Sequence, residues 1–333
     1  MGCRWPPTDE RVAAFLARLE RGRDEVLGVV PERRRRVTVE QAVANAVMAG
    51  CLPDYAPVVV AAVEAMLQPP FNLVGPSASL GGSAILVIVN GPVVEDLQIN
   101  CRNNLFGPGN RANATIGRAV RLVLMNACGA IPGLFDRSCL GHPGKYTYCI
   151  AENAKDSPWL PLHAERGFAP EDSAVTVFAC EGPRQVRNGL SDTPEGILTT
   201  VADVMSSLGT SLTTSGSVAS SANGTRQGEM VIVIAAEHMR TISRHGWSKR
   251  DIRAFLSEHA RRTVADLKRG GGLPGEVEPG DEHRYIAVLE RADDLMIVAA
   301  GGDEGAISAV IPSWGPKVSS TAVTWPIAWG AHR

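Results

Sequence analysis

The chain has few aromatic residues, almost no net charge and no long hydrophobic run. Of its 333 residues only 5% are aromatic, and 33 Lys and Arg against 35 Asp and Glu leave a net charge of −2. Such a charge provides no general attraction to nucleic acids or anionic membranes. No segment supplies the roughly 18 apolar residues of a transmembrane helix, and no apolar core of a signal peptide follows Met1. We therefore expect a soluble, cytoplasmic protein that binds neither nucleic acid nor membrane.

Familiar cofactor and metal motifs are missing as well. The glycine-rich stretch at residues 107–118 fits neither the dinucleotide-binding fingerprint nor a Walker loop, so neither a nicotinamide cofactor nor ATP follows from it. The seven cysteines are odd in number and widely spread, which is unlike a disulfide scaffold, and they match no standard zinc spacing. We therefore expect the cysteines to be free thiols. The sequence identifies no cofactor.

The order of apolar segments predicts the α/β class, with two α/β (or α+β) domains, mixed sheets and an N-terminal helical segment. The first domain is expected at residues 1–168 and the second at residues 169–333. Ser248 and Asp251 predict a capping box at the start of the last long helix. Residues 206–228, rich in Ser, Thr and Gly, fit a mobile lid or an irregular surface insertion equally well. The helices are expected at residues 8–21, 39–49, 55–67, 112–127, 195–208 and 249–268, and the strands at residues 84–89, 174–180, 230–236, 285–289, 295–299 and 306–311.

The strongest local signal is the glycine-rich stretch at residues 107–118. Its glycines permit close backbone approach, and Asn110 or Asn113 can cap the helix that follows. The free amides of that helix, helped by Arg111 and Arg118, would attract a carboxylate or a phosphate. The alternative is a purely structural turn.

A second signal is the crowding of thiol, imidazole, amine and carboxylate side chains between residues 139 and 166. His142 or His163 could activate the Cys149 thiol, with Lys145 lowering its pKa and Glu152 orienting the base. Two other readings stay open. Cys149 is a small buried residue in a strand, or Cys139, His142, Cys149 and His163 together hold a metal ion.

Cys51 is a further thiol candidate because it lies where one predicted helix ends and the next begins. The positive end of the second helix would lower its pKa. The alternative is a buried cysteine that fills space behind Met48.

Four segments stand out together, at residues 45–51, 88–92, 107–118 and 143–153. They resemble a largely uncharacterised bacterial family that is associated with a thiol or selenol protein bearing a UGSC motif. The resemblance covers about residues 5–330 and implies that the chain is the larger partner of a two-part enzyme. The chain has no Cys-Gly-Ser-Cys of its own, so a small thiol or selenol partner would be a separate chain. Residues 79–81 read Ser-Leu-Gly where family members carry Thr-Thr-His, which implies altered activity if that histidine acts in the family.

From these signals we predict an enzyme that uses a cysteine thiolate on a small anionic, carboxylate-like substrate in a cleft between the two domains. Hydrolysis, elimination (a lyase) and thiol redox chemistry all stay open. The alternatives are a non-catalytic binding protein or partner subunit, and a metal-dependent lyase or hydratase. Trp314, Trp325 and Trp329 lie in predicted loops, where they suit a pocket or the interface of a homo-oligomer. The predicted catalytic residues are Cys51, Cys149, His142, Lys145, Glu152 and His163, and the predicted substrate-binding residues are Asn90, Asn104, Gly109, Asn110, Arg111, Arg118 and Asn153.

Overall fold

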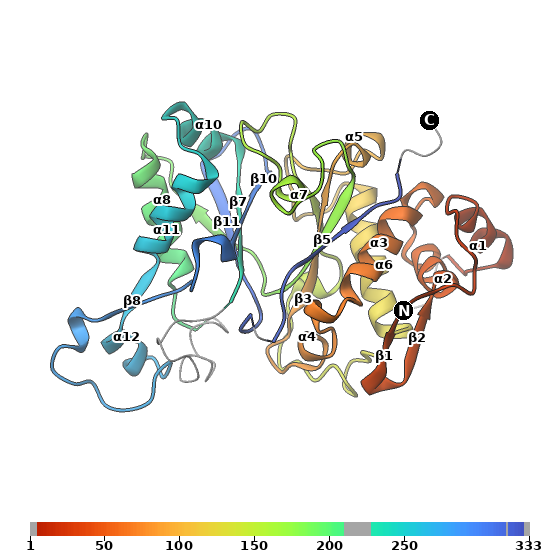
Figure 1. Cartoon of the computed structure of the whole chain (residues 1–333), viewed down its shortest axis with the longest axis horizontal. Helices are drawn as coiled ribbons and strands as arrows, with labels where there is room; N and C mark the ends of the chain where they lie inside the picture. Colours follow the sequence, from red (N-terminus) through yellow and green to blue (C-terminus); the bar gives the residue numbers. More distant parts are fainter. Residues whose placement is uncertain (1–4, 210–227, 318, 330–333) are drawn as a thin grey trace. The chain divides into compact units, whose positions relative to one another are not determined.

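The computed structural model describes residues 5–209, 228–317 and 319–329. Helices and mixed β-sheets alternate along the chain, which confirms the predicted α/β class (Figure 1). The chain divides into two compact units. The first unit comprises Met1–Glu152, Leu160–Ala179 and Ala322–Arg333, and the second comprises Asn153–Trp159 and Cys180–Thr321.

The first unit is built on a four-stranded mixed sheet with the order β12-β5-β3-β4. The strands are β3 (Ala84–Asn90), β4 (Cys149–Ala151), β5 (Ala174–Cys180) and β12 (Val323–Pro326). β3 and β4 are parallel, whereas β5 and β12 are antiparallel. The predicted strands at residues 84–89 and 174–180 are confirmed. However, β5 was expected in the second domain, and it lies instead in the sheet of the first unit because its partners are β3 and β12.

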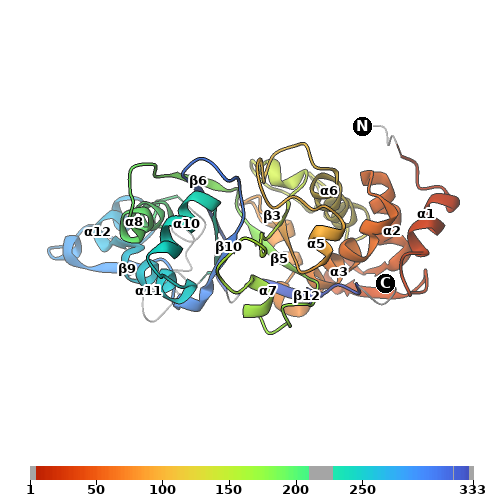
Figure 2. The same cartoon turned by 90° about the horizontal axis from the view of Figure 1, so that it is seen from above.

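Helices cover this sheet in successive layers, and the long ones lie where the apolar periodicity predicted them (Figures 1 and 2). α2 begins with a Thr38–Gln41 capping box and ends at Gly50, whose φ of +86° suits a residue without a side chain. All of α3 except Glu64 is buried, and α3 packs on α6 and β12. The elements are α1 (Asp9–Leu16), β1 (Val26–Val30), β2 (Arg35–Thr38), α2 (Val39–Ala49), α3 (Ala56–Met66), α4 (Val74–Ala78), α5 (Val93–Asp96), α6 (Arg111–Asn126) and α7 (Leu162–Glu165).

The second unit has its own four-stranded sheet with the order β10-β7-β11-β6. β7 and β10 are parallel, and β11 is antiparallel to both β7 and β6. β7 and β10 are buried along their whole length and contribute to one apolar core with α8, α10 and α11. The strands are β6 (Arg184–Arg187), β7 (Met230–Ile234), β10 (Leu295–Ala299) and β11 (Ile307–Pro312), and the helices are α8 (Pro194–Met205), α10 (Ala236–Arg244), α11 (Lys249–His259) and α12 (Val264–Arg269).

The prediction of a single helix at residues 249–268 is wrong. α11 begins at the predicted Ser248–Asp251 capping box but ends at His259, and β8 (Arg261–Thr263) then pairs with β9 (Tyr285–Ala287). The side chain of Thr263 accepts a hydrogen bond from the Asp266 amide and starts α12 as a new helix. A cap in the middle of the apolar pattern thus divides it into two helices.

Two further expectations concern the chain as a whole. Most of the segment predicted as a lid or insertion, residues 210–227, lies outside the described residues. Within the described part of the chain, no single helix is both long and apolar enough to cross a membrane.

Candidate functional site

Two buried polar residues meet at the carboxyl ends of the parallel strands β3 and β4. Asn90 is the last residue of β3, and Glu152 directly follows β4. The Asn90 Nδ2 donates a hydrogen bond of 2.6 Å to Glu152 Oε2. The two side chains are only 1% and 2% exposed. Neighbouring parallel strands end at the same edge of a sheet, which is where α/β proteins commonly place their sites.

A third buried residue joins them through the short helix α7. The Leu162 amide, in the first turn of α7, donates a hydrogen bond of 2.7 Å to the same Glu152 Oε2. His163 is the next residue and is 1% exposed. Glu152 Oε2 therefore accepts two hydrogen bonds, one from β3 and one from the segment that carries the imidazole.

Three polar atoms of this group have no hydrogen-bond partner among the described residues. They are the Oδ1 of Asn90 and both ring nitrogens, Nδ1 and Nε2, of His163. Buried polar atoms are almost always bonded, because an unsatisfied one costs about 1–3 kcal/mol. We call Asn90, Glu152 and His163 the orphan cluster; the sequence predicted all three as site residues.

Asn153 and Asn113 are also buried, but their hydrogen bonds serve the fold. Asn153 holds a turn, since its side chain donates to Asp156 Oδ2 at 3.0 Å and accepts from the Asp156 amide at 3.3 Å. Asn113, which the sequence suggested only as a cap, donates to the carbonyls of Asn100 and Cys149 at 2.9 and 3.2 Å. It therefore ties α6 to β4. Its sequence signal is a polar residue on the apolar face of a helix.

Both predicted nucleophilic thiols are buried. Cys51 lies at the predicted connection between α2 and α3, but the predicted fall of its pKa is wrong. Burial raises the pKa of Cys51 to about 12, although Thr115 and Arg111 act in the opposite direction. Burial also raises the pKa of Cys149, and the neighbouring Cys51 adds to that rise. Both groups are therefore thiols near neutral pH.

Lys145 and His142 have other partners close to them in the sequence. The Lys145 Nζ forms an ion pair of 2.8 Å with Asp136, which also binds Arg121 at 2.8 Å. Burial raises the pKa of Asp136, but hydrogen bonds from Lys145, Ser138 and Arg121 outweigh it and hold that pKa well below its usual range. The Nδ1 of His142 accepts a hydrogen bond of 3.2 Å from the Gly144 amide. Lys145 therefore serves a buried ion pair.

Two predicted anion-binding residues of the glycine-rich stretch form hydrogen bonds with other groups of this chain. Asn110 is the N-cap of α6, accepts from the Asn113 amide and donates to the Gln98 carbonyl at 2.9 Å. The Arg111 guanidinium donates two hydrogen bonds, of 3.1 and 3.0 Å, to the Gly50 carbonyl. The anion site remains a prediction, for which the half-buried Arg118 is the remaining cation.

Asn104 and Gly109 adopt backbone conformations that shape this stretch. Asn104 has a φ of +57°, and its side-chain amide donates to the Pro108 carbonyl. Gly109 has a φ of +120°, which is strained for residues with a side chain. Both residues therefore define the turn that leads into α6.

The metal-ligand set suggested by the sequence is not assembled. In the part of the chain that the structure describes, no group of three or more His, Cys, Asp or Glu side chains is placed to hold a metal ion. Cys149 lies in β4 and His163 in α7, whereas Cys139 is exposed on a loop.

Comparison with known protein families, with curated proteins and with solved structures gives no match. The resemblance to the bacterial family with a UGSC-motif partner therefore remains a prediction.

Proposed function

We propose that the chain is an enzyme that transfers a proton to or from a small polar substrate at the orphan cluster. The observation that carries the proposal is a set of three buried polar atoms without partners among the described residues. One belongs to Asn90, which binds the Glu152 carboxylate, and two belong to His163, which follows the Leu162 whose amide binds the same carboxylate. Each such atom costs stability, and a substrate that bonds to them would recover that cost.

The three side chains suit different roles in such a reaction. A neutral imidazole has one nitrogen that accepts a proton and one that donates a hydrogen bond, so His163 is the proposed base and acid. Glu152 is positioned by Asn90 and by the Leu162 amide, and its carboxylate is the proposed second proton carrier. The Oδ1 of Asn90 would accept a hydrogen bond from a donor on the substrate. In this step the substrate loses a proton to His163 and keeps the electron pair of the broken bond.

The thiolate mechanism predicted from the sequence is less well supported than proton transfer. It requires Cys51 or Cys149 to ionise near neutral pH, and burial raises the pKa of both. A small anionic substrate is compatible with either mechanism, since the proposal concerns the groups that move protons. A non-catalytic binding protein remains the alternative class.

The proposal can be tested by following proton exchange in heavy water. The protein is incubated in D₂O with a panel of small carboxylic acids, ketones and amines, and proton NMR records enzyme-dependent loss of C–H signals or new products. His163→Gln and Glu152→Gln are expected to lower the rate about 10²- to 10⁴-fold. His259→Gln, at an exposed position on α11, is the matched control and should keep the full rate. Unchanged rates in both cluster variants would contradict the proposal, and binding without turnover would favour the binding protein.

A further inference from the structure

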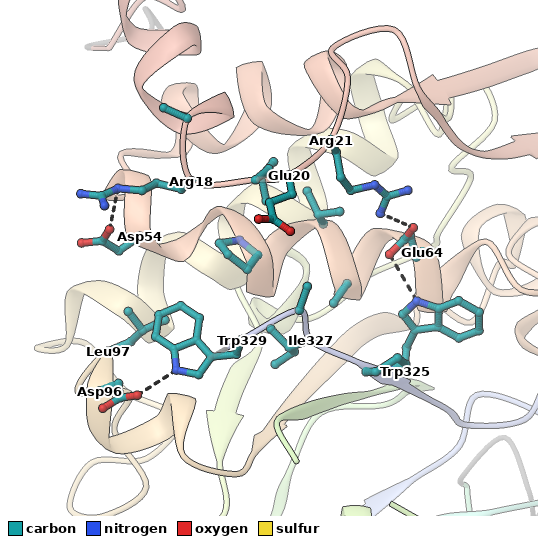
Figure 3. Close-up of a pocket in the computed structure, with 17 residues that line it drawn as sticks. Arg18, Glu20, Arg21, Asp54, Glu64, Asp96, Leu97, Trp325, Ile327 and Trp329 are labelled. Atoms are coloured by element: carbon teal, nitrogen blue, oxygen red, sulfur yellow. Dashed lines mark hydrogen bonds and ion pairs between the residues drawn. The ribbon is translucent and has the colours of Figure 1, made fainter. Parts of the chain in front are cut away.

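The first unit also contains an open groove that is separate from the orphan cluster. Its volume is about 1020 Å³, which is enough for a drug-sized molecule (Figure 3). Tryptophans predicted from the sequence to line a pocket or an interface contribute to it, namely Trp325 and Trp329. The remaining lining comes from the segment after α1, one face of α3, the end of α5 and the chain after β12.

One side of the groove is a face of α3. Pro57, Val60, Ala61 and Glu64 follow one another at helical spacing, so that they share a face of the helix. Three of these side chains are apolar, and Ile327 adds a fourth apolar contact from the chain after β12. This apolar surface suits the carbon skeleton of a ligand.

Both indole rings of the groove are held by carboxylates. The Trp325 Nε1 donates to Glu64 Oε2 at 3.2 Å, and the Trp329 Nε1 donates to Asp96 Oδ2 at 2.8 Å (Figure 3). Each bond uses the only polar donor of the ring, the Nε1–H, and does not involve the electron-rich faces of the ring. Indole faces attract cations, and an orientation fixed in advance lowers the cost of binding one.

The ionisable groups of the groove carry an excess of negative charge. Arg18 pairs with Asp54 at 2.9 Å, and Arg21 pairs with Glu64. Because Glu20 and Asp96 also line the groove, its lining among the described residues contains four carboxylates and two guanidinium groups. In Figure 3 the Glu20 carboxylate points into the space between the two arginines and the tryptophans. The potential in the groove therefore favours a cation over an anion.

We propose that this groove binds an organic cation, an ammonium group carried on an apolar body. The ammonium group would lie near Glu20 and Asp96 and against the indole faces, while the apolar body would pack on the face of α3 that lines the groove. This chemistry is offered by a free amine or by a lysine side chain of a peptide. It differs from the small anionic substrate expected from the sequence, so the groove is a second site.

A set of three ligands that differ mainly in charge tests the proposal. They are 4-phenylbutylamine, 4-phenylbutanol and 4-phenylbutyrate, titrated while NMR records the indole N–H signals of Trp325 and Trp329. Trp325→Phe and Trp329→Phe assign those signals. Ligands with about 11 non-hydrogen atoms are expected to bind in the millimolar range, the amine about 10-fold more tightly than the other two.

Variants that remove a negative charge show whether the amine binds in the groove. Asp96→Asn and Glu20→Gln should each weaken amine binding about 3- to 10-fold, while Glu10→Gln on α1, which is exposed and outside the groove, should leave it unchanged. Thermal melting of each variant checks that it is folded. Acetylated Phe-Lys-Phe amide, compared with its norleucine counterpart, then distinguishes a lysine-bearing peptide from a free amine as the natural source.

Several outcomes would overturn the proposal. They are equal or tighter binding of the alcohol or the butyrate, no shift of either indole signal at about 10 mM amine, or unchanged affinity in both acidic variants. Indole signals that shift with protein concentration and not with amine would show that a second copy of the chain occupies the groove.

Discussion

Replacing His163 with leucine is expected to stabilise the protein. Both ring nitrogens of His163 are buried and have no partner within the described residues, so the folded state bears their desolvation without a compensating hydrogen bond. Removing that penalty should raise the free energy of unfolding by about 1–3 kcal/mol, after roughly 1 kcal/mol is lost to imperfect packing of the new side chain. Residues kept for activity commonly show this trade-off between stability and function.

His238 is the matched control for this experiment. It is also 1% exposed, but its Nδ1 lies 2.7 Å from Ser308 Oγ and its Nε2 lies 3.0 Å from the Asn188 carbonyl. His238→Leu removes two hydrogen bonds and leaves the buried Ser308 hydroxyl and the half-buried Asn188 carbonyl unsatisfied, so it should lower the free energy of unfolding by about 2–4 kcal/mol. The same substitution at two equally buried histidines is thus expected to change the free energy of unfolding in opposite directions.

Urea unfolding followed by linear extrapolation measures both changes. Because the two histidines lie in different units, hydrogen exchange of peptides covering residues 160–170 and 230–245 should report each unit separately. If His163→Leu lowers the free energy of unfolding as much as His238→Leu does, the ring nitrogens of His163 are satisfied in solution. His163 would then offer no unsatisfied nitrogen to a substrate, and the orphan cluster would have no role in proton transfer.

Three further predictions concern other parts of the first unit. In native protein at pH 7, iodoacetamide should alkylate the exposed Cys139 well before the buried Cys51 and Cys149, and mass spectrometry would show the order. Gly117→Ala should lower the free energy of unfolding by about 1–3 kcal/mol, because its new Cβ would lie 2.6 Å from the backbone nitrogen of Tyr148. Asp136→Asn should cost about 3 kcal/mol at pH 7 in urea unfolding, because two cations lose their carboxylate.

The pH dependence of the Asp136 effect follows from the direction of its shift. Its pKa in the folded state lies below that of the unfolded chain, so its contribution is complete above about pH 4 and is lost as the pH falls further. The difference between wild type and Asp136→Asn should therefore shrink at pH 3. An equal difference at both pH values would contradict the ion-pair explanation.

Two outcomes would contradict the other predictions. Rapid alkylation of Cys51 or Cys149 at pH 7 would restore the thiolate mechanism. Gly22→Ala is the control for Gly117→Ala, since nothing lies within 4 Å of its new Cβ; equal losses at both positions would show that the close approach at Gly117 is unimportant.

Local pattern predicted α2, α3, α6 and α8 and half of the described strands. α2, β5 and β10 have the bounds expected from their apolar residues, because each buries a face or its whole length. Strand partners were not predictable in the same way. β12 is a four-residue strand that contains Trp325 and Pro326, and nothing local indicates that it pairs with β5.

The candidate site was predicted only in part. Asn90 and Glu152 are polar residues that follow apolar strands, which is a local signal for a sheet edge. The amide of Leu162 carries no such signal, since every residue but proline has one. The direction of the Cys51 pKa was missed because a helix terminus contributes only about 0.3–1 kcal/mol, whereas full burial shifts a pKa by up to several units.

The position of β12 sets the order in which the first sheet can be completed during synthesis. β5 leaves the ribosome early, but its outer neighbour follows only after most of the second unit, residues 180–321, has been made. At about 5–20 residues per second, the roughly 140 intervening residues take on the order of 7–30 s. Throughout that interval one edge of β5 has unpaired backbone groups that can accept a strand from another nascent chain. The nascent chain is therefore expected to need the protection of a chaperone until β12 emerges.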